Sequence, residues 1–161
     1  METFGETQVR QFFASLGLEK GIRSFAESTE NSFLAAQAIG VEQGQIVKSV
    51  LFLADERPVL VLMSGDMNVN SKKLKNLLGV RKVRIADPEA VVAVTGFAVG
   101  GVPPVAHREP IPTLIDASLR RFAEIYPAAG TANNMFPTTF EELARLTHAT
   151  TVDVGVPKKK P

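Results

Sequence analysis

Residues 46–54 of this 161-residue chain, IVKSVLFLA, give the strongest indication of its architecture. Apolar side chains occupy both alternating positions of this stretch, as expected of a central strand that is covered on both faces of a sheet. Residues 59–63 follow the same pattern. The two runs therefore predict strands in the middle of one sheet.

Helix and strand signals alternate on both sides of these two runs. The first predicted helix ends at Gly17, and the second is capped by Ser28, Thr29 or Asn31 and ends before Gly40. A third helix is capped by Asn70 or Ser71 and stops at Gly79, and a fourth starts at Asp87 and Pro88 and ends near Gly96. The last helix is opened by a capping box of Thr138 and Glu141. Shorter strands are predicted at 22–25, 83–85, 111–116 and 150–154, with a helical turn at 117–121. This order predicts an α/β (mixed α+β) domain, a mixed sheet wrapped by helices.

Composition limits the functions that the chain can have. With 45% hydrophobic residues, residues 1–161 are expected to form a single domain, with a flexible basic tail at 157–161. The absence of Cys excludes thiol nucleophiles and thiolate metal sites, and two histidines offer little for a metal centre, so no metal or cofactor is expected. The formal net charge of +1 means that any contact with RNA must be local, and binding to DNA is not expected.

The start of the chain and its apolar runs predict where the protein resides. Residues 1–10, METFGETQVR, lack the basic-then-apolar order of a signal peptide. No run approaches the roughly 18 to 20 apolar residues of a membrane span. We therefore expect a cytoplasmic protein that does not insert into membranes.

Lys48 is the first candidate functional residue, because it lies inside the most apolar predicted strand. An ammonium buried there without a partner is costly, so this lysine must reach a cleft, pair with an acid or lower its pKa. Alternatively, the side chain extends along the strand and releases its ammonium to water.

A glycine-rich stretch, TGFAVGGVPP at 95–104, is the second candidate. Gly100 and Gly101 permit positive φ and close backbone approach, and the following prolines stiffen the chain, so successive N–H groups can form a cradle for an anion or oxyanion. The spacing differs from that of a dinucleotide-binding motif. A tight turn between a helix and a strand explains the glycines equally well.

Asp116 and the loop 130–134 are weaker candidates. Asp116 ends the predicted strand IPTLID, where its carboxylate can orient a substrate amine, although a cap of the following helical turn is favoured. The loop GTANN can line a pocket, but an Asn-rich turn is the simpler interpretation.

Basic residues are concentrated after residue 71. The cluster consists of Lys72, Lys73 and Lys75 on one predicted helix, with Arg81, Lys82 and Arg84 nearby in sequence. Such a cluster can bind phosphates or form a solvated helix face, and the pattern favours neither.

Four segments of this chain together resemble one known family. They are QIVKSVLFL (45–53), KKLKNLLGVRKVRIADPE (72–89), TGFAVGGVPP (95–104) and IPTLIDASL (111–119). The chain resembles the YbaK/EbsC-type aminoacyl-tRNA deacylases, relatives of the editing domain inserted in bacterial prolyl-tRNA synthetases. The strand lysine and the GxxxGG-Pro stretch, in this order and at this distance, are the most specific features of the resemblance.

The resemblance implies a curved mixed sheet and a trans-editing enzyme. Such an enzyme hydrolyses the ester between a small wrong amino acid and tRNA(Pro) or a related tRNA, with prolyl-tRNA synthetase as a further partner. Lys48 would be a cationic anchor in the catalytic pocket, and the N–H groups of Gly100 and Gly101 would stabilise the carbonyl oxygen. Substrate contacts are assigned to Ser28, Thr29, Gly96, Asp116, Gly130 and Thr131, and tRNA contacts to Lys72, Lys73, Lys75 and Arg81.

One departure and one alternative qualify this expectation. Some relatives that clear alanine carry Gly-His-Pro where this chain has Gly130, Thr131 and Ala132, so alanine specificity is not carried over. Esters of cysteine, alanine, serine and threonine all stay open. The alternative function is a non-catalytic module of the same fold that binds a nucleotide, RNA or a synthetase, and a small-ester hydrolase would use the same cleft.

Overall fold

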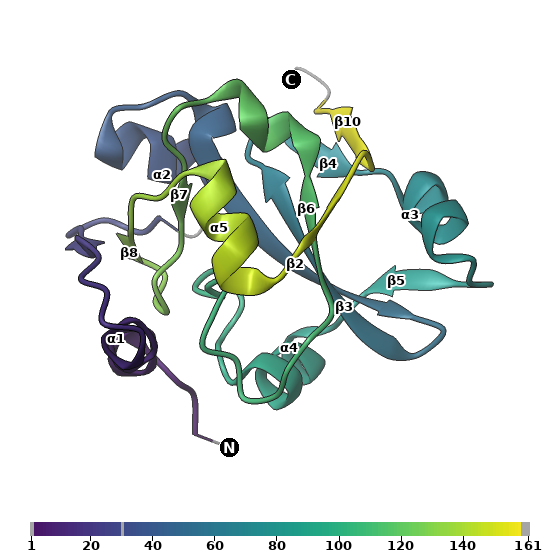
Figure 1. The fold of residues 1–161 in the computed structure, drawn as a ribbon, viewed down its shortest axis with the longest axis horizontal. Coiled ribbons are helices and arrows are strands. Elements are labelled where there is room, and N and C mark those ends of the chain that lie inside the picture. The colour runs from purple at the N-terminus through teal and green to yellow at the C-terminus, as the bar shows by residue number, and fades with distance from the viewer. Residues whose placement is uncertain (1, 30, 159–161) are drawn as a thin grey trace.

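The computed structural model describes residues 2–29 and 31–158. Its centre is the antiparallel hairpin of β2 and β3, and the described strands add up to a mixed six-stranded sheet (Figure 1). β5 lies on one side of β2, β6 and β9 follow β3 in parallel, and β7 pairs in parallel with the start of β2. These strands are β2 (Ile46–Ala54), β3 (Arg57–Ser64), β5 (Val83–Ile85), β6 (Thr113–Asp116), β7 (Tyr126–Pro127) and β9 (Thr150–Val152). The predicted fold class is confirmed.

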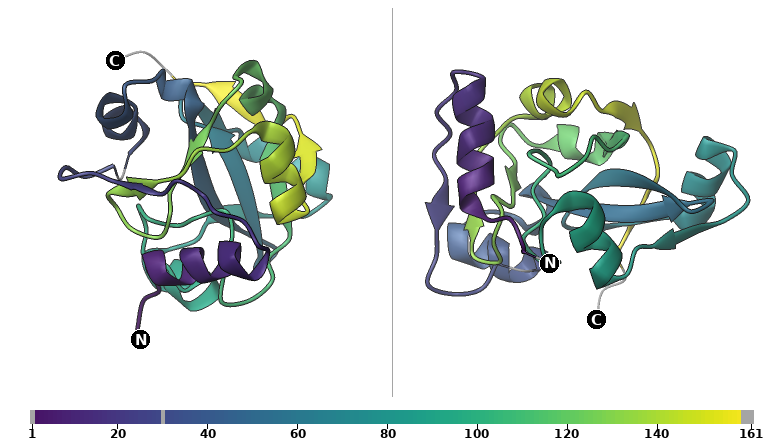
Figure 2. Two further views of the ribbon diagram at one scale, coloured as in Figure 1. Left: turned by 60° about the vertical axis from the view of Figure 1, so that its left-hand side comes forward. Right: turned by 90° about the horizontal axis from the view of Figure 1, so that it is seen from below.

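Helices cover both faces of the sheet (Figures 1 and 2). Because side chains alternate along β2, Val47 and Leu51 join a core cluster with α1, α4 and α5, whereas Phe52 and Ala54 join a second cluster with Leu74 of α3. The helices are α1 (Glu6–Ser15), α2 (Ser32–Ile39), α3 (Ser71–Leu78), α4 (Pro88–Thr95) and α5 (Phe140–Thr147). β2 is thus covered on both faces, and this explains its apolar residues at both alternating positions, as the sequence predicts.

Side-chain caps set the beginning of most helices. Asn31, Asn70 and Asp87 accept hydrogen bonds from the backbone N–H groups three residues later, and these caps open α2, α3 and α4 as predicted. Gly40 and Gly79 end α2 and α3 in the left-handed conformation, with φ of 80° and 65°.

The start of α5 corrects one prediction. Thr139, not Thr138, caps this helix, because its hydroxyl accepts the N–H of Glu142 at 3.1 Å. The backbone of Thr138 is paired instead with Ile125 in a β-bridge, by two hydrogen bonds of 2.9 Å. The bridge holds Thr138 extended, so the helix begins one residue later.

The C-terminal region corrects a second prediction. The strand predicted at 150–154 ends at Val152 as β9, and a further strand that the sequence did not predict, β10 (Gly155–Pro157), follows and pairs antiparallel with β4 (Met67–Val69). Pro157 is therefore part of a strand, and Lys158 N donates to Asp66 O at 3.2 Å. The predicted flexible tail at 157–161 stays a prediction, and residues 159–161 lie outside the described residues.

A small ribbon completes the fold beside α2. It pairs β1 (Arg23–Ser24) with β8 (Asn134–Met135), and two short 3₁₀ helices lie at Gln43–Gln45 and Ala117–Arg121. In the part of the chain that the structure describes, no helix is long and apolar enough to cross a membrane.

Candidate functional site

The middle of β2 has an open edge. β7 pairs with the first two residues of this strand and β5 with its last three, so residues 48–51 face no strand on this side within the described residues. Leu51 O accepts a hydrogen bond from Ala86 N on this side, at 2.9 Å. Alternate residues of a strand direct their backbone groups to the same side, so the N–H and C=O of Ser49 also face the open edge.

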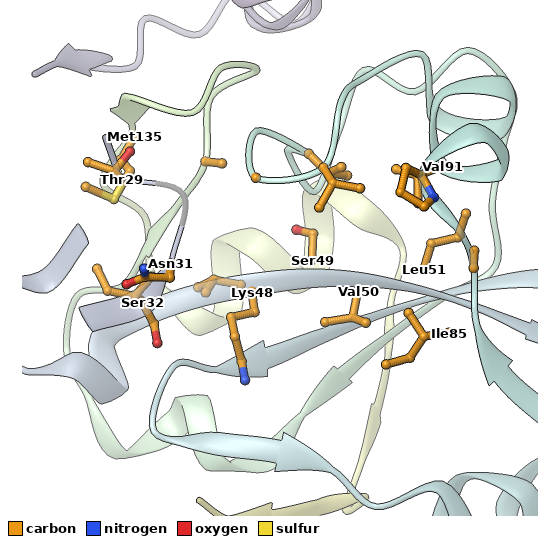
Figure 3. Close-up of a pocket in the computed structure, with 18 residues that line it drawn as sticks. Thr29, Asn31, Ser32, Lys48, Ser49, Val50, Leu51, Ile85, Val91 and Met135 are labelled. Carbon is orange, nitrogen blue, oxygen red and sulfur yellow. The ribbon is translucent and has the colours of Figure 1, made fainter. Parts of the chain in front are cut away.

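A cavity of about 340 Å³ lies at this edge (Figure 3). It is bordered by residues 46–51 of β2, the start of α2, the junction of β5 and α4, the glycine-rich loop and Met135 of β8. Most of its lining side chains are apolar, with a few polar groups from β2 and from the segment before α2. This combination of an apolar wall and a few polar groups is typical of a ligand pocket.

Lys48 lines the pocket and has a half-buried side chain. It extends from the same side of β2 as Val50 (Figure 3). Its Nζ donates to Met67 O at 2.5 Å and to Asn68 Oδ1 at 3.4 Å. Burial, reinforced by the positive charge of Lys158, lowers the pKa of Lys48 to about 8. These features favour a lysine held in a cleft over one that extends freely into water.

Ser49 also lines the pocket, and sequence reasoning missed it. Its side chain extends from the opposite side of β2 to that of Lys48 (Figure 3). Among the described residues, Ser49 Oγ is the buried side-chain polar atom that has no hydrogen-bond partner. A buried hydroxyl without a partner is costly, so a ligand or water is the expected partner. The signal in the sequence was a second polar residue next to Lys48 in an otherwise apolar strand.

The glycine-rich loop approaches the pocket through Gly100. Gly100 lines the cavity with φ of +95°, and its N–H has no backbone partner among the described residues. Gly101 N donates to Ala98 O at 3.1 Å, so this N–H is committed to a turn. The expectation that both N–H groups face a substrate is therefore wrong for Gly101. Gly96 does not line the cavity; it ends α4 at φ +90° and packs against Phe4.

Gly101 is required for close packing of two loops. A Cβ added to Gly101 would lie 2.7 Å from the carbonyl carbon of Thr131 and 2.8 Å from its Cα. Because those atoms are backbone, we expect Gly101→Ala to lower the free energy of unfolding by about 1 to 3 kcal/mol, as overpacking does. Gly21→Ala is the control, since nothing lies within 4 Å of that position. Equal denaturant midpoints for the two variants would contradict the prediction.

The segment before α2 is tied to the loop that follows β7. Thr29 lines the pocket, and its hydroxyl donates to Ala132 O at 3.1 Å. Ser28 Oγ donates to the same carbonyl oxygen at 3.3 Å and does not line the cavity. Ser28 and Thr29 thus hold the loop beside the pocket, and Thr29 alone of the two reaches it.

Gly130 and Thr131 lie outside the cavity lining. Thr131 N donates to Asn134 Oδ1 at 3.1 Å, and Thr131 Oγ1 donates to Asn133 Oδ1 at 2.9 Å. These hydrogen bonds form the Asn-rich turn that was the simpler interpretation of the sequence. Gly130 packs against the backbone of Gly5, which a Cβ would meet at 2.8 Å.

Asp116 is a buried structural carboxylate. Its Oδ2 accepts the N–H of Ser118 at 3.1 Å, and its Oδ1 accepts the N–H of Val154 at 2.8 Å. The cap of the following 3₁₀ helix is confirmed. Asp116 lies outside the cavity lining, and both of its oxygens accept backbone hydrogen bonds, so a substrate contact by this residue stays a prediction.

The basic helix α3 lies on the same face of the sheet as Lys48. Leu74 joins α3 to the core cluster that contains Phe52 and Met63, and Met67 of β4, the strand that precedes α3, accepts a hydrogen bond from Lys48. Lys72, Lys75 and Arg81 border a separate surface hollow. Lys73 Nζ donates to Gly155 O at 3.2 Å and lies 3.8 Å from an Asp153 carboxylate oxygen.

Comparison with known proteins identifies the family. Residues 26–146 match the model of the aminoacyl-tRNA editing domain. The chain belongs to this family. The YbaK/EbsC-type resemblance is thereby confirmed, and it extends over the residues that build the pocket of this editing domain.

Individual relatives agree with this assignment. The editing domain is 31% identical over 137 residues to the uncharacterized protein YwhH of Bacillus subtilis (strain 168), covering 84% of this chain and 87% of the relative. It is 36% identical over 121 residues to the proline–tRNA ligase of Latilactobacillus sakei subsp. sakei (strain 23K), covering 75% of this chain but 21% of the ligase. A crystal structure of a proposed trans-editing enzyme for prolyl tRNA synthetase superposes with a TM-score of 0.88 at 37% identity, covering 94% of this chain and 96% of the other.

Proposed function

We propose that this protein is an aminoacyl-tRNA deacylase that acts in trans on tRNA(Pro), or a related tRNA, carrying a small wrong amino acid. The observation that carries the proposal is the cavity of about 340 Å³ that Lys48, Ser49 and Gly100 line together. Membership of the editing domain family and the likeness to a proposed trans-editing enzyme support it.

The pocket contains the groups that ester hydrolysis needs. Water attacks the carbonyl carbon, negative charge develops on the carbonyl oxygen, and the ribose hydroxyl leaves with a proton, giving a free amino acid and an intact tRNA. Such a reaction requires a held substrate and donors aimed at the developing charge, but no protein nucleophile. In our proposal the Lys48 ammonium anchors a phosphate or the 3′-terminal oxygens, and Gly100 N–H donates to the carbonyl oxygen.

Ser49 completes this arrangement. Its hydroxyl is buried at the pocket without a partner among the described residues. We assign it to the attacking water, which it would orient by accepting or donating one hydrogen bond. The free backbone edge of β2 at Ser49 offers a further donor and acceptor to the aminoacyl group.

The partners follow from the charge distribution. With a net charge of +1, the protein has no long-range field that would hold RNA tightly. Lys72, Lys73, Lys75 and Arg81 are proposed to contact the acceptor stem locally. The matches to proline–tRNA ligases support prolyl-tRNA synthetase as a docking partner.

The decisive experiment is a deacylation panel. The purified protein is mixed with tRNAs charged with alanine, cysteine, serine, threonine and proline, and loss of each ester is followed over time. Selective hydrolysis of one mischarged tRNA is expected, with correctly charged prolyl-tRNA(Pro) spared. If a folded protein leaves every ester intact, the non-catalytic binding module is the better reading of this pocket.

Ser49→Ala separates catalysis from stability. Removal of a buried hydroxyl that has no partner is expected to leave the free energy of unfolding unchanged or to raise it by up to about 1 kcal/mol. Deacylation is expected to fall about tenfold, the equivalent of one lost hydrogen bond of roughly 1.4 kcal/mol. Ser15→Ala is the control, because the exposed Ser15 hydroxyl donates to Phe12 O far from the pocket. Full activity in Ser49→Ala would remove Ser49 from the mechanism.

A further inference from the structure

The C-terminal strand brings a second lysine to Lys48. β10 pairs with β4 in a register that sets Pro157 opposite Met67, whose carbonyl oxygen accepts the Lys48 hydrogen bond. The next residue is Lys158, and its N–H donates to Asp66 O at 3.2 Å. Lys158 Nζ donates to the hydroxyl of Ser32, a pocket-lining residue, at 3.2 Å. Lys158 is thus held through both its backbone and its side chain.

Within the described part of the chain, neither of these two ammonium groups forms an ion pair with a carboxylate. Asp66 is the carboxylate in their vicinity, and Arg121 binds it with Nη2 at 2.7 Å from Oδ1 and Nη1 at 3.0 Å from Oδ2. The same guanidinium lowers the pKa of Asp66. Among the described residues, neither Lys48 nor Lys158 lies within 4.0 Å of any carboxylate. The Lys48 and Lys158 charges therefore lie beside a pocket-lining strand and the pocket-lining Ser32, without a direct ion pair among the described residues.

We propose that Lys48 and Lys158 together bind one phosphate group of the RNA backbone at the mouth of the pocket. Their positive charges repel each other in the free protein, and a phosphate between them removes this repulsion while accepting hydrogen bonds from both. The carbonyl oxygen of Met67 holds the Lys48 ammonium, and the Ser32 hydroxyl holds that of Lys158. This assignment rests on the proposed function for the identity of the ligand, since RNA is the substrate proposed there.

The β4–β10 ribbon continues this site toward α3. Lys73 on α3 contacts Gly155 at the start of β10, and Lys158 follows the end of the same strand. A strand rises about 3.3 Å per residue, so roughly 10 Å separate Gly155 from Lys158. A phosphodiester backbone that leaves the Lys48 and Lys158 pair along this ribbon meets the basic helix next. The proposed path joins the pocket to the tRNA contacts on one face of the sheet.

The test compares ligands that differ by one phosphate. Binding of adenosine 5′-monophosphate and of adenosine is measured by titration calorimetry for the wild type, Lys158→Met, Lys158→Arg and Arg57→Ala. Arg57 is the matched control, because it is exposed at the start of β3 and its removal changes the net charge by the same amount. We expect the wild type and Arg57→Ala to prefer the monophosphate at least tenfold, Lys158→Met to lose most of that preference, and Lys158→Arg to retain it.

The results separate this inference from the proposed function. If Lys158→Met keeps the preference, or if the wild type shows none, the phosphate site is overturned even when the deacylation panel succeeds. If the preference depends on Lys158 but no ester is hydrolysed, the phosphate site stands and the deacylase proposal fails. With mischarged tRNA, Lys158→Met is expected to raise KM with little change in kcat and to reduce the salt slope of binding by about 1.

The pH dependence of monophosphate binding distinguishes a direct role of Lys158 beside Lys48 from a merely structural role. The groups that face Lys48 are Lys158 from the C-terminal segment and Asp66, with its partner Arg121, from the β3–β4 turn. Burial and the charge of Lys158 lower the pKa of Lys48 to about 8. Because the ammonium loses its proton above this pH, binding of the monophosphate is expected to weaken as the pH rises above 8. In Lys158→Met that weakening is expected at a higher pH. An unchanged pH profile would contradict the pairing of the two lysines.

Discussion

Replacement of Lys48 by methionine is expected to reduce deacylation about 100-fold or more, the usual cost of removing one donor that stabilises charge in an active site. The Lys48 ammonium adjoins the pocket and is held by Met67 O and Asn68 Oδ1. Methionine keeps an unbranched apolar side chain out to Cε and removes the ammonium with its charge and hydrogen bonds. The measurement is kcat/KM for the ester that the panel selects, beside a circular dichroism melt that shows a folded variant.

The charge of Lys48 also predicts the pH dependence. Its pKa is lowered from 10.5 to about 8, so the ammonium loses its proton above pH 8 and kcat/KM is expected to decline there. Stability is expected to change in the opposite sense. Between pH 8 and 10.5 the unfolded chain holds a proton that the folded protein has released, so the free energy of unfolding rises with pH. Lys48→Met should show neither the decline in kcat/KM nor the rise in the free energy of unfolding. If the substitution lowers activity but the wild type shows neither pH effect, the assigned role of the ammonium is contradicted.

Asp116→Ala is expected to destabilise the fold by about 3 kcal/mol, because hydrogen bonds to a charged group contribute about 1.5 to 3 kcal/mol each. The carboxylate is 2% exposed and accepts the N–H groups of Ser118 and Val154. Alanine leaves both donors without a side-chain partner and detaches the segment that enters β10. Urea denaturation of the two proteins measures the difference.

Asp116→Asn sharpens this test. An amide oxygen can replace one of the two acceptors, so about half of the loss is expected. At a temperature at which the variants are folded, KM for mischarged tRNA should equal that of the wild type. A stable Asp116→Ala protein with a raised KM would instead support a substrate contact by Asp116.

Much of the fold was predictable because its signals are local. Asn31, Asn70 and Asp87 cap helices where the sequence indicated them, and the hairpin of β2 and β3 forms from the two apolar runs. The start of α5 was misplaced by one residue because a β-bridge to Ile125, distant in the chain, holds Thr138 extended. A capping motif in the sequence cannot reveal such a partner.

The candidate site was predictable only in part. Lys48, Gly100 and Thr29 were named from the sequence and do line the cavity. Ser49 was missed because its significance depends on an open strand edge and an unpartnered hydroxyl, and both follow from how distant segments pair.

The central strands, most helix ends and the presence of a lysine within an apolar strand could all be read from local sequence patterns. These features depend on alternation, on capping and on the cost of desolvating a charge, which act within a few residues. Only the tertiary structure decided that Gly101 N–H is used in a turn, that Asp116 holds β10 in place, and that Lys158 lies beside Lys48. Those outcomes depend on contacts between residues far apart in the chain, and such contacts are set by the packing of the whole domain.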